Sequence, residues 1–148
     1  MPAKTKVQPI NPYLTVKGAA DAIAFYRKAF GAKENQRMPA PDGKRVMHAD
    51  LTINGGTVML SDEFPDHGGP AAPSAAKPAP VAIAIQCAKP AEVDATFRRA
   101  MDAGCKSTME PHDSFWGARF AMLADPFGHR WMLNAPLPAK QAKKEKKK

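Results

Sequence analysis

The sequence repeats one pattern of predicted elements at a spacing of 73 residues, and this repeat constrains the fold more than any other feature. At this offset the start of a helix, the glycine that ends it, a hairpin glycine and the final strand all coincide with their counterparts. The matched pairs are Asp21/Asp94, Ala22/Ala95, Gly31/Gly104, Lys33/Lys106, Gly55/Gly128, Met59/Met132 and Leu60/Leu133. Self-similarity at a fixed period is typical of one supersecondary unit used repeatedly. We therefore expect one unit built twice.

Each half of the chain reads as a strand, a helix and three further strands. Apolar residues at helical spacing precede Gly31, and a long alternating strand precedes the hairpin signal Asn54-Gly55. The predicted elements are strands at 10–16, 33–38, 45–53 and 57–61 with a helix from 19 to 30, then strands at 81–86, 106–110, 118–124 and 129–133 with a helix over 90–103.

These elements predict an α+β fold of two βαβββ modules that form curved mixed sheets around a cavity. The first module spans 9–62 and the second 81–135. Between them, 63–80 holds five prolines and two adjacent glycines, which predicts a linker or a mobile loop. Residues 1–8 are predicted to be a flexible arm, and 136–148 a disordered Lys-rich tail.

Charge and composition narrow the class of protein. The net charge is +8, but the last ten residues carry six Lys and one Glu, so the basicity belongs to the tail and nucleic-acid binding is not expected. A contact of this tail with a polyanion stays open as an alternative. No apolar run is long enough to span a membrane. Two cysteines are too few for a disulfide framework, and we expect a cytoplasmic protein.

Five segments suggest a family. FYRKAFGA, MHADLTINGG, MLSDE, FWGAR and DPFGHRW, in this order, resemble the vicinal oxygen chelate superfamily over residues 8–135. That superfamily includes glyoxalase I, the extradiol dioxygenases and the bleomycin- and fosfomycin-resistance proteins, and the sequence is most similar to its PhnB-like branch. The resemblance implies paired βαβββ modules and a homodimer.

The resemblance also locates four metal-ligand positions, which metal-binding members fill with His or Glu. Here they fall close to Asn11, Met59, Ala82 and Met132. Hard divalent ions prefer oxygen and nitrogen donors, thioethers suit soft ions, and an alanine offers no donor. We therefore predict no metal and no cofactor at these positions.

Six residues are candidates for ligand binding: Tyr13, His48, Met59, Trp116, Arg119 and Met132. The two methionines are either a polarisable cavity lining or ordinary core. Tyr13 could donate a hydrogen bond to a ligand from the cavity wall. His48 lies on the strand face opposite the apolar one, where it serves as an acid–base group or as a structural hydrogen-bonding residue. Trp116 and Arg119 together could bind an anion or a π-system, or Arg119 could pair with Glu110 or Asp125.

Three further observations argue against additional functional residues. His129 and Trp131 alternate with Met132, so they are expected to face away from the cavity and to pack. The run from Asp62 to His67 holds three carboxylates and a histidine that could bind a metal, but its Pro and Gly neighbours favour a flexible loop. No nucleophile with a partner base is recognisable from the sequence.

The sequence thus supports one function and two alternatives. The first is a metal-free, PhnB-like homodimer that binds a small organic molecule between its modules. The second is a glyoxalase- or dioxygenase-like lyase, isomerase or oxygenase with a relocated metal or with His48 as the acid–base group. The third is a polyanion-binding protein that uses the Lys-rich tail.

Overall fold

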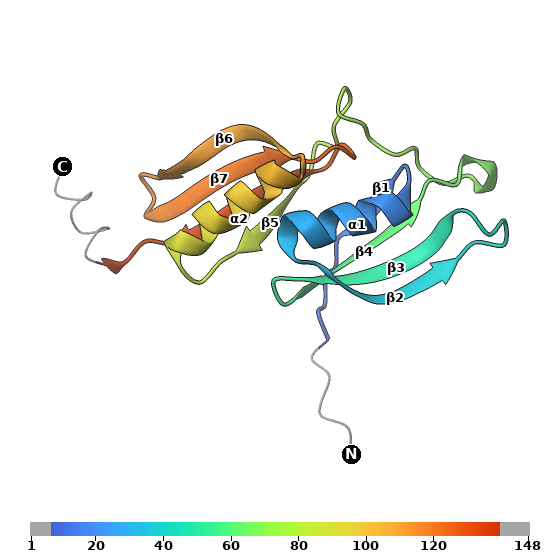
Figure 1. Ribbon diagram of the computed structural model, residues 1–148, viewed down its shortest axis with the longest axis horizontal. Coiled ribbons are helices and arrows are strands. Elements are labelled where there is room, and N and C mark those ends of the chain that lie inside the picture. The colour runs from blue at the N-terminus through green and yellow to red at the C-terminus, as the bar shows by residue number, and fades with distance from the viewer. Residues whose placement is uncertain (1–6, 140–148) are drawn as a thin grey trace, which may run out of the picture.

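The computed structural model describes residues 7–139 and consists of two four-stranded sheets, each covered on one face by one helix (Figure 1). The first module contains β1 (Tyr13–Val16), α1 (Ala19–Phe30), β2 (Lys33–Pro39), β3 (Val46–Ile53) and β4 (Gly56–Asp62). The second contains β5 (Ala82–Gln86), α2 (Pro90–Ala103), β6 (Lys106–Asp113), β7 (Ala118–Ala124) and β8 (Arg130–Pro136). The predicted α+β fold with two βαβββ modules is confirmed.

The strand order is the same in both sheets, which explains the repeat in the sequence. The orders are β1-β4-β3-β2 and β5-β8-β7-β6, with the first pair of each parallel and the others antiparallel. β1 begins at Tyr13, three residues later than predicted, so Asn11 precedes it. Neither sheet closes into a barrel among the described residues, so β1 and β2 are the edges of the first sheet and β5 and β6 those of the second.

Alternation along β3 separates the two faces of the first sheet, as predicted. Ala49, Leu51 and Ile53 are buried beneath α1, whereas His48 and Asp50 are half-buried on the other face. We call this second face of each sheet its open face, because no helix covers it. The residues His48 and Asp50 of β3 on the open face are thus polar, whereas those beneath α1 are apolar.

A buried carboxylate fixes the start of α1. Asp62, at the end of β4, accepts hydrogen bonds from the backbone N–H groups of Gly18 and Ala19 at 2.9 and 2.8 Å, and from that of Val46 at 2.7 Å. These first N–H groups of a helix have no partner within the helix, and a negative charge there is favourable. Gly31, with φ of +66°, ends the helix as predicted.

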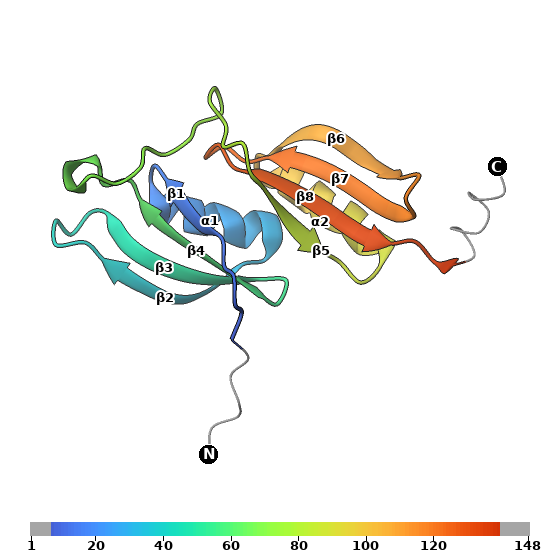
Figure 2. The ribbon, with the colours of Figure 1, turned by 180° about the vertical axis from the view of Figure 1, so that it is seen from behind.

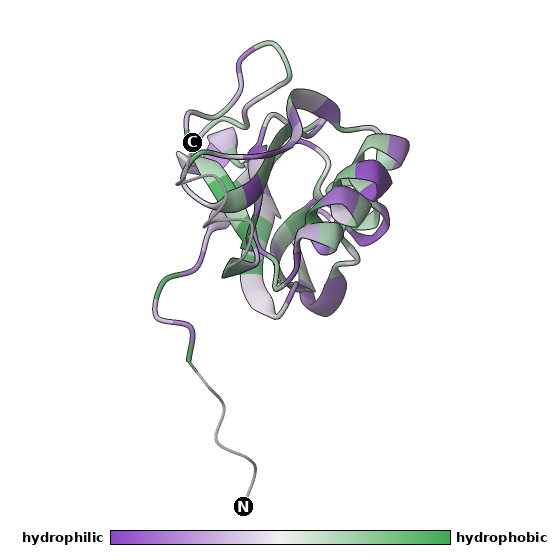
Figure 3. Ribbon diagram, turned by 90° about the vertical axis from the view of Figure 1, so that its left-hand side faces the viewer, coloured by the Kyte–Doolittle hydropathy of each residue, from purple (hydrophilic) through white to green (hydrophobic). Residues whose placement is uncertain are grey.

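The two modules meet through their helices and through the turn that opens β8. α1 and α2 lie side by side in front of the sheets (Figure 1), so both open faces look to the opposite side (Figure 2). The side view shows the same arrangement, with the helices together on one side (Figure 3). In the part of the chain that the structure describes, no helix is long and apolar enough to cross a membrane.

A buried carboxylate also joins the modules. Asp125 accepts a 2.6 Å hydrogen bond from the Tyr26 hydroxyl of α1 and a 2.8 Å bond from the Trp131 indole of β8. The Trp131 ring lies 4.6 Å from that of Phe30, and the Nε2 of His129 is 2.9 Å from the carbonyl oxygen of Thr15 in β1. Trp131 and His129 are buried, and Trp131 alternates with Met132 along β8, so Trp131 faces away from Met132 as expected; His129 packs against β1 and also lines a cavity beside that strand.

The segment 63–80 is tied to both modules. It holds one 3-10 turn at Pro65–His67. Its first part is held by Arg45, which pairs with Asp66 at 2.9 Å, and its last part by a backbone bond from Ala79 to Gly128 at 2.8 Å. The predicted flexible arm (1–8) and Lys-rich tail (136–148) lie for the most part outside the described residues.

Candidate functional site

A chain of three polar side chains crosses the open face of the first module. The Tyr13 hydroxyl of β1 lies 2.8 Å from the Nδ1 of His48 on β3, and the Nε2 of His48 lies 2.7 Å from a carboxylate oxygen of Asp50. Tyr13 is half exposed, and the His48 and Asp50 side chains retain about a quarter of their surface. All three groups are therefore hydrogen-bonded yet remain accessible from the open face.

Strand register explains why these residues meet. Met59 of β4 stands directly opposite Tyr13 on one side and Asp50 on the other, and His48 is the next residue of β3 on the same face. Residues in register across a sheet are about 5 Å apart at Cβ, which is within reach of these side chains. The predicted candidates Tyr13, His48 and Met59 are thus brought together, and Asp50 joins them.

A cavity adjoins this open face at Tyr13. It has a volume of about 520 Å³ and lies between β1 and the end of the 63–80 segment. Pro80, Val81 and Ile83 give it an apolar wall, and its basic lining residues are Lys77 and His129. This volume falls in the range of small-molecule sites, roughly 300–1,000 Å³.

The open face of the second module is less polar. Met132 of β8 pairs with Met122 of β7, and its neighbour across β5 is Ala84. Trp116, at the tip of the β6–β7 hairpin, is 54% exposed, and its ring packs 5.4 Å from that of Phe120. The candidates Met132 and Trp116 therefore lie on this open face, apart from the Tyr13–His48–Asp50 group.

Arg119 does not lie on either open face, so the structure does not bring it together with Trp116 as predicted. It points to the helix-covered side, where it bonds to Asp94 of α2 at 3.0 Å and to Asp113 at 3.1 Å. The alternative of an acidic partner for Arg119 holds, but the partners are Asp94 and Asp113 and not Glu110 or Asp125. Alternation puts Phe120 on the open face, which leaves Arg119 facing α2.

The four family metal positions do not fit a hard divalent cation. In the strand register, Tyr13 stands opposite Met59 and Ala84 stands opposite Met132. These two residues lie two positions after Asn11 and Ala82. The side chains at the four metal-ligand positions are therefore two thioethers, a phenol and a methyl group, which do not suit a hard cation. Asn11 has a buried side-chain nitrogen with no hydrogen-bond partner among residues 7–139, and an amide nitrogen does not coordinate a cation.

The carboxylates between Asp62 and His67 are each engaged elsewhere. Asp62 binds the α1 N-terminus, Asp66 pairs with Arg45, and Glu63 accepts a 2.8 Å bond from the backbone of Ala72. The guanidinium of Arg45 holds the pKa of Asp66 down to about 2. Across the described chain, no three His, Cys, Asp or Glu side chains gather as a metal site would require.

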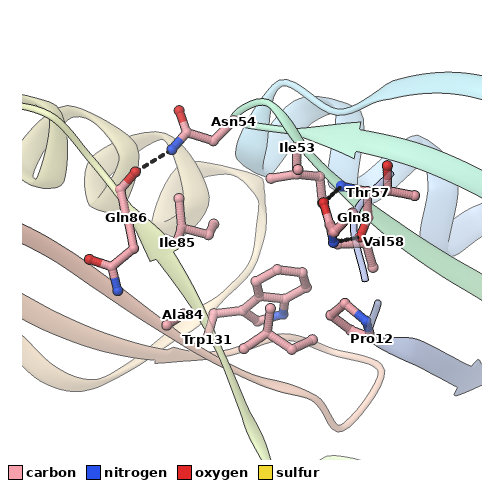
Figure 4. A pocket seen from close by; sticks show the side chains of 12 residues that line it. Gln8, Pro12, Ile53, Asn54, Thr57, Val58, Ala84, Ile85, Gln86 and Trp131 are labelled. Carbon is pink, nitrogen blue, oxygen red and sulfur yellow. Dashed lines mark hydrogen bonds between the residues drawn. The ribbon is translucent and has the colours of Figure 1, made fainter. Parts of the chain in front are cut away.

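A second, smaller cavity follows the seam between the modules (Figure 4). The buried indole of Trp131 lies on one side, and the Asn54 side chain bridges the seam with a 2.6 Å bond to the carbonyl oxygen of Gln86. Its volume of about 210 Å³ is below the usual range for organic ligands. We assign it to the packing of the modules.

Comparison with known proteins identifies the family. The sequence model of the Glyoxalase/Bleomycin resistance protein/Dioxygenase superfamily matches residues 7–133. The uncharacterized protein Rv0887c of Mycobacterium tuberculosis is 45% identical over 130 residues, which covers 86% of this chain and 74% of that protein. Protein PA1353 of Pseudomonas aeruginosa superposes with a TM-score of 0.69 at 26% identity, over 90% of this chain and all of that one. A PhnB protein of Bacillus cereus has the same fold, with a TM-score of 0.65 at 22% identity over 86% of this chain and 99% of its own. The chain belongs to the glyoxalase/bleomycin resistance protein/dioxygenase superfamily.

Proposed function

We propose that this protein binds a small organic molecule on the open face of the first module, without the four-ligand divalent metal of its metal-binding relatives. The observation that carries the proposal is the group formed by Tyr13, His48 and Asp50 beside Met59 on an uncovered sheet face. Such a face offers hydrogen-bonding groups next to a polarisable apolar floor. The apolar part of the ligand extends into the 520 Å³ cavity along β1.

The two open faces complement each other chemically. The first carries the polar group at Tyr13, and the second carries Met122, Met132 and the exposed Trp116. A molecule with one polar and one apolar side would be held best between a face of each kind. Within one chain this cannot happen, because both open faces look to the same side (Figure 2).

A homodimer would bring the two kinds of open face against each other, and it is part of the proposal. A second copy turned by a two-fold axis would lay its second-module face over the first-module face of its partner, giving two equivalent sites. Exposed apolar side chains support such a cover: Val7 is 83% exposed, Val81 69% and Phe115 93%. Light scattering should therefore give a mass near twice 16.0 kDa, and a monomer mass would contradict the dimer.

Metal analysis and a binding assay test the proposal. Protein purified without added metal should hold far less than one Zn, Ni, Mn or Fe per chain by elemental analysis. It should bind the aromatic anion 1-anilinonaphthalene-8-sulfonate with a rise in the fluorescence of that dye. Met59→Asp should weaken this binding at least tenfold, because it places a charge on the apolar floor.

The matched control is Met47→Asp on the same strand as His48. Met47 is 42% exposed and alternation puts it on the other side of β3, so this variant should bind the dye as the wild type does. Equal binding by Met59→Asp and the wild type would refute the site. One bound metal per chain would refute the metal-free reading and favour the glyoxalase- or dioxygenase-like alternative.

A further inference from the structure

We propose that Tyr13, His48 and Asp50 form a proton relay, in which Tyr13 is the catalytic residue and the substrate is an enolisable carbonyl compound. The inference rests on the proposed function, because it places the reacting molecule at the same face. It goes further in giving the protein an isomerase-type activity. The observation behind it is the unbroken series of hydrogen bonds from the cavity wall to a carboxylate.

The direction of the relay follows from the hydrogen-bonding capacity of each group. The Asp50 carboxylate can only accept, so the Nε2 of His48 carries the proton of their 2.7 Å bond. In the neutral imidazole the Nδ1 then has a free lone pair, and it accepts the hydroxyl proton of Tyr13 at 2.8 Å. The arrangement of acid, base and orienting carboxylate is that of an activated oxygen nucleophile or base.

The proton transfer balances without any further reactant. A hydrogen on the carbon next to the substrate carbonyl moves as a proton to the Oη of Tyr13, and the C–H electron pair becomes the enolate. At the same time the original hydroxyl proton of Tyr13 moves to the Nδ1 of His48. The imidazolium that results is stabilised by Asp50. The reverse transfer, to the carbon or to the enolate oxygen, regenerates the relay and completes a tautomerisation.

The class of substrate follows from chemistry and from the lining of the cavity. Protons on oxygen or nitrogen exchange rapidly without help, whereas a proton on carbon leaves slowly and gains from a positioned base. Of the three relay residues, Tyr13 alone lines the 520 Å³ cavity, so the proposal places the substrate against Tyr13. Lys77 can attract a carboxylate, and Val81 and Ile83 can contact an apolar body. Phenylpyruvate combines all three features and is the probe we choose.

Activation of Tyr13 can be measured without any ligand. An aryl sulfonyl fluoride reacts with a phenol when the phenol oxygen bonds to sulfur, fluoride leaves and a base takes the phenol proton. Mass spectrometry should find the label on Tyr13 and not on Tyr26, which is fully buried. His48→Gln should lower the labelling rate at least tenfold, and free imidazole should restore the rate in His48→Ala. Met47→Leu, on the other side of β3, should label as the wild type does.

A labelling rate unchanged in His48→Gln would overturn the relay, whatever the fate of the proposed binding function. A merely structural hydrogen bond would also show no rescue by imidazole. The second measurement follows deuterium exchange at the methylene group of phenylpyruvate in D₂O by proton NMR. The wild type should accelerate exchange, and Tyr13→Phe should lose at least tenfold of the acceleration.

Binding of phenylpyruvate is measured in parallel by isothermal titration calorimetry. If the wild type binds phenylpyruvate but its methylene deuterium exchange is no faster than in buffer, the catalytic role is overturned. The binding function then still stands. Protein that neither binds nor exchanges the probe overturns the assigned substrate class.

Discussion

The Tyr26 hydroxyl should be among the most important single groups for stability, because it joins the two modules at a buried charge. The variant Tyr26→Phe removes this hydroxyl and keeps the ring. The side chain is 0% exposed, its partner Asp125 is 3% exposed, and their bond is 2.6 Å long. After the change, the Trp131 indole is the remaining partner of that carboxylate oxygen.

The expected loss follows from burial and charge. A hydrogen bond to a charged group contributes about 1.5–3 kcal/mol, and a buried acceptor left underbonded costs at the upper end of this range. We therefore expect Tyr26→Phe to lower the free energy of unfolding by about 2–3 kcal/mol. For a domain of this size, the melting temperature should fall by roughly 5–10 °C. Urea unfolding followed by circular dichroism gives the free energy, with the slope unchanged.

The chain offers a matched control in its other tyrosine. Tyr13→Phe makes the same chemical change at a half-exposed side chain, where solvent can replace the lost partner, so its cost should stay below about 1 kcal/mol. A loss of less than about 0.5 kcal/mol for Tyr26→Phe, or an equal loss in both variants, would refute the view that Asp125 fastens the modules together.

Three other results should follow from the structure. Gly128→Ala should lower the free energy of unfolding in urea by at least about 2 kcal/mol, because φ is +91° and the new Cβ would lie 2.5 Å from the backbone nitrogen of Ser74. The control Gly43→Ala, with φ of +71° and no atom within 4 Å, should cost about 1 kcal/mol. Equal costs would contradict the docking of 63–80 on the turn at Gly128. Burial, with a contribution from Asp125, raises the pKa of the Cys105 thiol to about 12. Above about pH 8.5 the unfolded state therefore loses this proton while the folded state keeps it, and this group should lower the free energy of unfolding by about 1.4 kcal/mol per pH unit. In unfolding experiments from about pH 8.5 to about pH 10, Cys105→Ala should show a shallower fall. Removal of 139–148 should leave the binding of DNA unchanged at every salt concentration, and a lost salt-dependent affinity would instead favour the polyanion alternative.

Local patterns were sufficient to predict the modules. The glycines after each helix, the Asn54-Gly55 hairpin and the alternation around His48 are effects of neighbouring residues, and each lies where it was expected. The ends of elements were less accurate, since β1 starts later and β6 runs longer than predicted. The sequence offers no local signal for such ends.

The candidate site depended on contacts between distant residues. Tyr13 reaches His48 only because β1 inserts in parallel beside β4, 46 residues further along the chain, and no local pattern indicates this register. Nearness in sequence groups Asp62 with its loop neighbours, although its partners are the start of α1 and Val46 of β3. The partner of Arg119 is Asp94 on α2, 25 residues earlier in the chain, and no local pattern indicates this pairing.

The most direct test of the account is a crystal structure of protein purified without added metal and soaked with phenylpyruvate. We predict a two-fold dimer with the probe within hydrogen-bond distance of the Tyr13 hydroxyl, above Met59 and beneath the second-module face of the other copy. Density for the probe only at the helix-covered side, or a divalent ion held by side chains of the open face, would contradict it.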